Sequence, residues 1–170
     1  RRGRTARTRP AGKLSAAEIG TAHHKFLQQV VLARADSKTG LKAEAQRLTD
    51  ERLLTGEEAA ALGFVALEKF WQSEVGQKIR AQAAQVRREL PFTARFAPAE
   101  LDGIIHGTDR RFDFGNGLQD EFVVVQGVAD LVVLQRDAIW LLDFKTDELT
   151  AGEVALKTKF YAPQLRLYAQ

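Results

Sequence analysis

The stretch GVADLVVLQRDAIWLLDFKTD, residues 127–147, consists of two apolar runs joined by a polar pair at 136–137. Runs rich in Val, Ile, Leu and Trp are typical of strands, and a polar pair between two of them indicates a hairpin. If the chain reverses at 136–137, residues whose numbers sum to 273 face each other. Asp130 then faces Asp143, and Lys145 points to the same side as Asp143 because side chains alternate along a strand.

Two carboxylates that face each other at the ends of apolar strands repel. A divalent cation removes that conflict, because carboxylate oxygens are the ligands that Mg²⁺ and Mn²⁺ prefer. Lys145 beside them would offset negative charge on a phosphate or help to activate a water. The alternative interpretation is that Asp130 and Asp143 only mark strand ends, where Asp is common. Spacing alone leaves both interpretations open.

Gly20, His24 and Gln28 are spaced by four in an expected helix and therefore share one face. His24 is a candidate imidazole ligand for a metal, and Gly20 would allow close approach of the backbone. His23 is a rival next door, and a structural role for either histidine is the alternative.

Three further polar residues are candidates. Glu89 lies in an expected strand whose neighbour Pro91 indicates irregularity, and its carboxylate would suit the same metal. Gln164 and Tyr168 share one face of the expected last helix. An ordinary helix surface is the alternative for this last pair.

Helical patterns fill the first half of the chain, strand patterns follow, and a helix ends it, so we expect an α/β or α+β fold. The expected helices are 15–32, which opens with a Ser-Ala-Ala-Glu capping box, 41–54, 55–83 with an interruption at Gly76, and 152–170. The expected strands are 86–96, with Pro91 at an edge or a bulge, 122–125, 127–134 and 138–144, with further short strands in the loop at 102–117.

Composition excludes several classes of protein. The chain has 170 residues, of which 45% are hydrophobic and 28% charged, so it is long enough and apolar enough to fold. The absence of Cys excludes disulfides, Cys-ligated zinc, iron–sulfur clusters and thiol nucleophiles. No apolar run is long enough to span a membrane and no signal peptide opens the chain, so we expect a soluble cytoplasmic protein.

The net charge of +3 comes from the first 13 residues, which hold five Arg and one Lys and no acidic residue. We expect residues 1–13 to be a linker or tail, and an Arg-rich arm of this kind is also able to contact nucleic acid phosphates. Residues 14–170 carry 19 basic and 22 acidic residues. Charge alone therefore does not identify a DNA-binding protein.

Five segments together resemble the RecB-type nucleases of the PD-(D/E)XK superfamily, and most closely the C-terminal nuclease domain of AddA-type helicase-nucleases. They occur in the family's order and are GTAHHKFLQ (20–28), RELPFTARF (88–96), VQGVADLVV (125–133), LLDFKTD (141–147) and YAPQLRLYA (161–169).

The resemblance implies a restriction-endonuclease-like core, with a mixed central sheet flanked by helices and preceded by a helical region. It implies hydrolysis of DNA phosphodiesters with Mg²⁺, or alternatively Mn²⁺, by an enzyme that is expected to be an exonuclease. Lys145 would be catalytic, together with the carboxylates of Asp130 and Asp143. The expected metal ligands are His24, Asp130, Asp143 and the carbonyl of Phe144, with Glu89 as a further candidate, and the expected DNA-positioning residues are Gln28, Gln164 and Tyr168.

The same resemblance sets expectations for domains and partners. We expect a nuclease domain at 14–170, with a helical part at 14–84 and the catalytic sheet and last helix at 85–170. The chain has no Gly-Lys-Ser/Thr phosphate loop, so it is either one domain of a longer protein or a small relative. The expected partners are DNA, an upstream helicase domain and an AddB-type protein, in double-strand-break repair in the bacterial nucleoid. The alternatives are a stand-alone RecB-like, CRISPR-type or phage exonuclease, and a nuclease-like module that binds DNA without cutting it.

Overall fold

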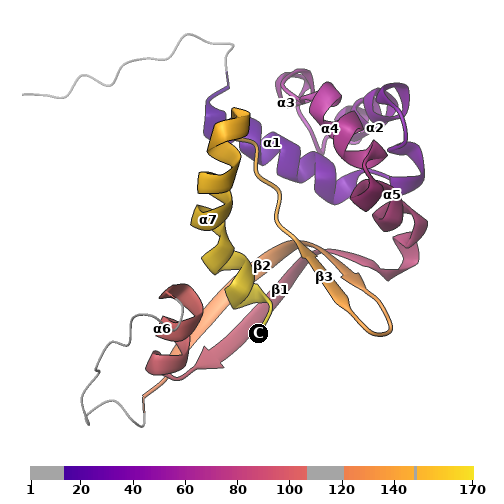
Figure 1. Ribbon diagram of the computed structural model, residues 1–170. Helices are drawn as coiled ribbons and strands as arrows, with labels where there is room; N and C mark the ends of the chain where they lie inside the picture. Colours follow the sequence, from indigo (N-terminus) through magenta and orange to yellow (C-terminus); the bar gives the residue numbers. More distant parts are fainter. Residues whose placement is uncertain (1–13, 107–120, 148) are drawn as a thin grey trace, which may run out of the picture. The chain divides into compact units, whose positions relative to one another are not determined.

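The computed structural model describes residues 14–106, 121–147 and 149–170. The chain divides into two compact units, one up to Gln77 and the other from Lys78 onward. Figure 1 follows their elements along the chain. Among the described helices, none has the length and apolar character needed to cross a membrane. The expected tail at 1–13 and the end of the expected loop, from residue 107, lie outside the described residues.

The first unit is helical throughout its described part (Figure 1). Its elements are α1 (Ala16–Gln29), the 3-10 turn η1 (Leu32–Arg34), α2 (Lys38–Asp50), α3 (Gly56–Ala60) and α4 (Phe64–Gln72), and α5 (Glu74–Ala81) crosses the boundary between the units. The expected capping box is confirmed, because Glu18 N donates to Ser15 Oγ at 3.2 Å and Ser15 N donates to Glu18 Oε2 at 2.6 Å. α1 ends three residues earlier than expected, since Val30 is extended.

The single helix expected over 55–83 is wrong, because three short helices replace it. Ser73 adopts an extended conformation after α4, and its Oγ accepts a hydrogen bond from Gly76 N at 3.2 Å. Ser73 therefore ends one helix and caps the next, which the apolar spacing did not reveal. Gly76 lies inside α5, where a Cβ would come within 2.2 Å of Phe70 O. Gly76 thus allows close packing and does not interrupt the helix.

A buried carboxylate ties α2 to the end of α1. Glu44 is fully buried and accepts hydrogen bonds from Val31 N at 2.9 Å, Arg34 Nη1 at 3.0 Å and Arg47 Nη2 at 2.8 Å. Burial, the largest single influence, raises the pKa of Glu44, but the bonds from Arg47, Val31 and Arg34 together hold it below its ordinary value of 4.5. The ion pairs therefore stabilise the charged form.

We expect Glu44→Ala to lower the free energy of unfolding by about 1–3 kcal/mol, because Val31 N and two guanidinium groups lose their acceptor. The folded-state pKa lies below the unfolded value, so this stabilisation is present above about pH 4.5 and is lost as the pH falls through the folded-state pKa. Urea unfolding at pH 7 and at pH 3.5 would measure both effects. The exposed Glu57→Ala serves as the control, and an equal loss at the two pH values would contradict the assignment.

The second unit contains an antiparallel sheet in the order β1-β2-β3 (Figure 1). Its elements are the 3-10 turn η2 (Ala83–Gln85), β1 (Val86–Phe96), α6 (Pro98–His106), β2 (Val123–Leu134), β3 (Ile139–Leu142) and α7 (Ala151–Tyr168). The α+β class is confirmed. The described strands pair only in antiparallel fashion, so the mixed sheet that we expected is not present among them.

The hairpin register is confirmed, because Leu131 pairs with Leu142 and Val133 with Trp140, as the sum of 273 requires. Gln135 N donates to Ala138 O at 2.9 Å and closes the turn. The expected strands at 122–125 and 127–134 are one continuous strand, β2. The short strands expected from residue 102 onward are wrong as far as His106, because this segment belongs to α6.

Candidate active site

Asp143 and Lys145 lie where β3 ends. The last pair of the β2–β3 ladder is Leu131 with Leu142, so Asp143 follows in the same register, opposite Asp130. The Asp143 side chain is only 8% exposed, and its Oδ2 pairs with the ammonium group of Lys145. The carboxylate and the lysine two residues later therefore face the same side.

Helix α7 brings two further polar side chains to this pair. Gln164 Nε2 donates to Asp143 Oδ1 at 2.9 Å and to the Tyr168 hydroxyl at 2.8 Å. Lys145 Nζ in turn donates to Gln164 Oε1 at 3.3 Å. One amide thus links the carboxylate, the ammonium group and the phenol, although residues 143 and 164 are 21 positions apart. The structure brings these four predicted residues together.

Asp130 and Glu89 lie opposite each other on neighbouring strands. Arg88 pairs with Leu131 and Leu90 with Ala129, which places Glu89 across from Asp130. Glu89 interrupts the ladder with a φ of 49°, a conformation that is strained for a residue with a side chain. One carboxylate oxygen of Glu89 and one of Asp130 are within 4.8 Å of each other.

Asp130 also fixes the chain that leaves β3. Its Oδ2 accepts a hydrogen bond from Phe144 N at 2.7 Å. This bond holds the backbone between Asp143 and Lys145 against the neighbouring strand. Asp130 therefore positions the segment that carries the other predicted catalytic groups.

The donor set of this unit fits a hard divalent cation. Glu89, Asp130 and Asp143 supply carboxylate oxygens from adjacent strands, and no described residue of the chain is a cysteine. Oxygen ligands of this kind suit Mg²⁺ and Mn²⁺ better than softer metals. A cation at these carboxylates would also reduce their mutual repulsion.

The two histidines of α1 differ in their contacts. His23 Nδ1 lies 2.8 Å from Ile19 O, and His23 Nε2 accepts a hydrogen bond from Gly63 N at 2.9 Å. Both ring nitrogens of His23 are thus used within the first unit, so His23 has a structural role. His24 is half-buried on α1 and Gln28 is exposed there. His24 and Gln28 belong to the first unit and the carboxylates to the second, so their part in a common site is a proposal.

The sequence did not single out a second set of contacts next to Lys145. The Tyr161 hydroxyl donates to Asp147 Oδ2 at 2.6 Å, and Lys157 Nζ donates to Asp147 Oδ1 at 3.3 Å. These bonds, the one from Tyr161 first, hold the pKa of Asp147 below its ordinary value, and Asp147 raises the pKa of Lys157. The only signal in the sequence was position, because Asp147 and Tyr161 stand at the ends of two of the five family-like segments.

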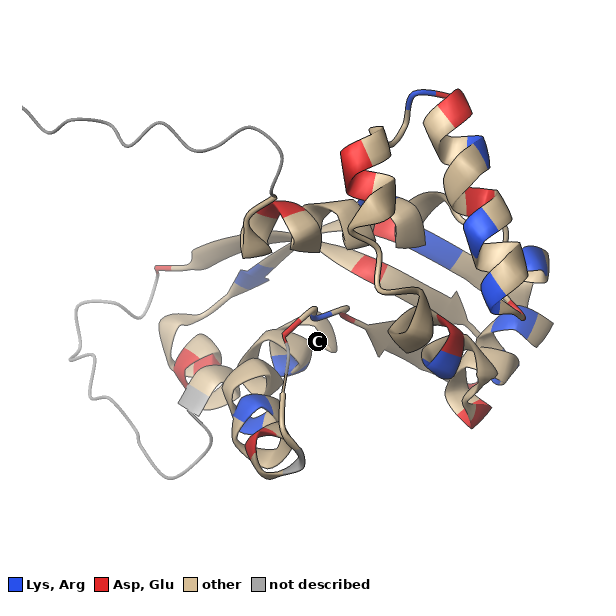
Figure 2. Ribbon diagram, turned by 90° about the horizontal axis from the view of Figure 1, so that it is seen from above, with Lys and Arg blue, Asp and Glu red and all other residues tan. Residues whose placement is uncertain are grey.

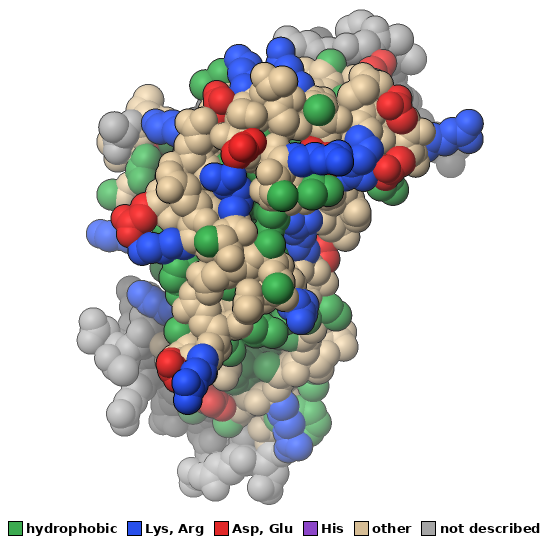
Figure 3. All heavy atoms as spheres, turned by 90° about the vertical axis from the view of Figure 1, so that its right-hand side faces the viewer, with side chains coloured by type: hydrophobic (Ala, Val, Ile, Leu, Met, Phe, Trp, Pro, Cys, Tyr) green, Lys and Arg blue, Asp and Glu red, His purple; other side chains and the backbone are tan. Residues whose placement is uncertain are grey.

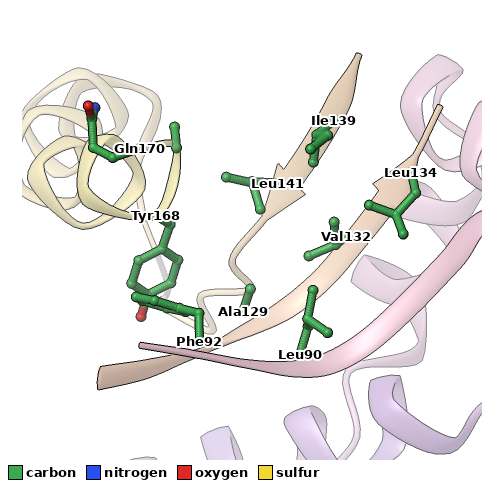
Figure 4. Close-up of a pocket in the computed structure, with 10 residues that line it drawn as sticks. Leu90, Phe92, Ala129, Val132, Leu134, Ile139, Leu141, Tyr168 and Gln170 are labelled. Carbon is green, nitrogen blue, oxygen red and sulfur yellow. The ribbon is translucent and has the colours of Figure 1, made fainter. Parts of the chain in front are cut away.

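Two hollows lie in the second unit, and they differ in chemistry. The larger, of about 290 Å³, is apolar and is lined by residues such as Leu90, Val132 and Leu141 (Figure 4). The smaller, of about 220 Å³, contains Asp143 and Lys145 and is also lined by Asp147, Lys157 and Tyr161. The smaller hollow is the candidate active site, because the ionisable groups converge there.

Gly127 allows two aromatic rings to pack beside the site. The rings of Phe92 and Tyr168 lie 4.8 Å apart at an angle of 65° (Figure 4). A Cβ on Gly127 would come within 2.6 Å of the Phe92 ring and 3.5 Å of Tyr168 Cε1. A glycine is therefore required at this position of β2, a requirement that the strand pattern did not reveal.

We expect Gly127→Ala to displace Phe92 and, through it, Tyr168, and to lower the free energy of unfolding by about 1–3 kcal/mol. The matched control is Gly152→Ala in α7, where a Cβ meets nothing within 4 Å, and we expect it to be neutral or slightly stabilising. Thermal unfolding of both variants is the measurement. Equal stability of the two would contradict the predicted close packing.

Surface charge alone does not mark the site. Basic and acidic residues are interspersed along the described helices in Figure 2. On the face drawn in Figure 3, basic, acidic and hydrophobic side chains are intermixed. The assignment of the site therefore depends on the local geometry of the carboxylates and Lys145.

Carboxylates from adjacent strands, with a lysine two residues after one of them and a glutamine from the following helix, make up the active-site architecture of a nuclease. The profile of the PD-(D/E)XK nuclease superfamily matches residues 1–170, and the chain belongs to this superfamily.

Curated relatives, all of them AddA-type subunits of ATP-dependent helicase/nucleases, are similar to almost the whole chain. The chain is 34% identical to the one from Moorella thermoacetica over 157 residues, which cover 92% of this chain and 10% of that protein. It is 32% identical to the one from Listeria welshimeri over 93% of this chain and 12% of that protein, and 32% identical to the one from Bacillus licheniformis over 92% and 12%. The chain therefore spans about a tenth of the length of these relatives.

Proposed function

We propose that the chain is a Mg²⁺-dependent deoxyribonuclease domain, at residues 14–170, that cuts DNA from an end. The observation that carries the proposal is the cluster in which Gln164 contacts both Asp143 and Lys145. Asp130, Asp143, the Phe144 carbonyl and His24 would hold the cation, with Glu89 as a further carboxylate ligand. Mn²⁺ would serve as an alternative ion.

The bound cation would polarise the scissile phosphate and make an attacking water more acidic. Lys145 has the chemistry to orient that water and to offset the negative charge that grows on the phosphate. Gln164 holds Lys145 and Asp143 in place, and its bond to the Tyr168 hydroxyl fixes the amide. Asp130 keeps the 143–145 segment in register through Phe144 N. Gln28, Gln164 and Tyr168 would position the DNA.

We also propose a cellular context. The relatives are named as subunits of an ATP-dependent helicase/nuclease, which supports a helicase domain upstream of this chain in the full-length protein. The same names support a role in double-strand-break processing, with an AddB-type protein as partner, at the DNA in the bacterial cytoplasm. The nuclease would then cut strands that the helicase has separated.

The test is cleavage of end-labelled linear single-stranded DNA by the purified chain in Mg²⁺, beside a sample with EDTA and a Lys145→Ala variant. We expect short labelled products from the wild type alone, and recovery of the EDTA sample when excess Mg²⁺ is added. If neither the isolated chain nor its full-length protein cuts faster than the Lys145→Ala variant in Mg²⁺ or Mn²⁺, the proposed activity is wrong. Binding of the DNA without cleavage would then favour a non-cleaving module.

A further inference from the structure

We propose that Tyr161 is a positioning residue for Lys145, with its ring held in place by Asp147. This inference rests on the proposed nuclease function. It assigns a task to the contacts beside the site that none of the predicted roles uses.

The Tyr161 ring contacts the side of the ammonium group that Asp143 and Gln164 leave open. Lys145 Nζ lies 5.0 Å from the centre of this ring, within the range of a cation–π interaction. Lys145 Nζ also pairs with Asp143 Oδ2 and donates to Gln164 Oε1 at 3.3 Å. A lysine side chain has four rotatable bonds, so contacts from several directions are needed to hold its ammonium group at one point.

Asp147 is a competing carboxylate that this arrangement keeps occupied. It stands two residues after Lys145 and lines the same hollow, so its carboxylate is a second acceptor within reach of the loop. Its Oδ2 accepts from the Tyr161 hydroxyl at 2.6 Å and its Oδ1 from Lys157 at 3.3 Å. With both oxygens engaged, Asp147 does not draw Lys145 away from Asp143. The same bond orients the Tyr161 ring toward Lys145.

The geometry predicts an order among substitutions. Tyr161→Leu removes both the ring and the hydroxyl, and we expect it to lower kcat about tenfold with KM within about twofold. Tyr161→Phe keeps the ring and loses only its anchor, so we expect a smaller loss, of about threefold. Asp147→Asn, on the loop after β3, weakens the same anchor without changing α7 and should match Tyr161→Phe. The matched control is Phe160→Leu, because Phe160 is the adjacent aromatic residue of α7 and is 73% exposed.

The test combines steady-state cleavage with NMR of chains whose lysine ε-methylene groups carry ¹³C. The Lys145 signal is assigned by its loss in Lys145→Ala. In the wild type and in Tyr161→Phe this signal should show an upfield ring-current shift, which Tyr161→Leu should remove and Phe160→Leu should leave unchanged. The NMR measurement needs no cleavage, so failure of the proposed nuclease function and failure of this inference are distinguishable.

Three outcomes would overturn the inference. The first is an unshifted Lys145 signal in the wild type. The second is a Tyr161→Leu variant that has the wild-type kcat, or that changes KM alone, as a simple DNA contact would. The third is an equal loss of kcat in Phe160→Leu. Should Tyr161→Leu fail to fold, Asp147→Asn and Tyr161→Phe carry the test, and wild-type kcat in both would reject the role of the anchor.

Discussion

Asp143→Ala is expected to reduce metal-dependent DNA cleavage by about 10²–10³-fold or more. The substitution removes a proposed metal ligand and also the acceptor for Gln164 Nε2 and for Lys145. Lys145 then loses its ion pair, and Gln164 loses the contact that orients its amide toward the site. The measurement is the initial rate of product formation from end-labelled DNA in saturating Mg²⁺.

Asp137→Ala is the matched control, because Asp137 is an exposed aspartate in the turn of the same hairpin. It should cut at the wild-type rate, and circular dichroism should show that both variants are folded. Wild-type cleavage by Asp143→Ala would show that the site is elsewhere. Loss of activity in both variants would point to the hairpin fold as the cause and not to the carboxylate.

A pair of substitutions at Asp130 is expected to separate catalysis from stability. Asp130→Asn removes the charge but keeps an oxygen that accepts from Phe144 N, so we expect cleavage to fall about 10²-fold while the melting temperature changes little. Asp130→Ala removes the acceptor as well, and we expect it to lose a further 1–3 kcal/mol, about the cost of leaving a half-buried N–H without its partner. Cleavage rates and urea unfolding of the two variants measure the two effects.

The comparison between these variants is the control for each. If Asp130→Asn were as unstable as Asp130→Ala, the charge itself would hold the 143–145 segment in place. If Asp130→Asn cut at the wild-type rate, Asp130 would not be a metal ligand, and only its contact with Phe144 would remain.

Much of the second unit followed from local sequence patterns. Two apolar runs around a two-residue turn specify one register, because a shift by one residue would turn the apolar side chains of β2 to the other side. That register alone predicts Asp143 across from Asp130, and the ladder confirms it. The fold class and the superfamily are confirmed. The catalytic and metal-binding roles of individual residues stay predictions.

What the sequence missed depended on contacts between distant segments. The break at Ser73 is a capping bond within an otherwise uniform helical pattern. The requirement for Gly127 is set by the Phe92 ring, which lies 35 positions earlier in the chain. Tyr161 meets Asp147 across the turn from β3 into α7, a distance that periodicity does not measure. In each case local spacing described one element correctly and carried no information about its neighbour.

The bonds from Gln164 to Asp143 and Lys145 also have a consequence for the order in which the domain matures. The β2–β3 hairpin is made of local contacts and can form as soon as it leaves the ribosome, whereas α7 is synthesised later. Until α7 docks, Lys145 lacks its contact with Gln164, and the hairpin alone is an incomplete enzyme. Nascent chains are thereby prevented from cutting DNA before the domain is complete.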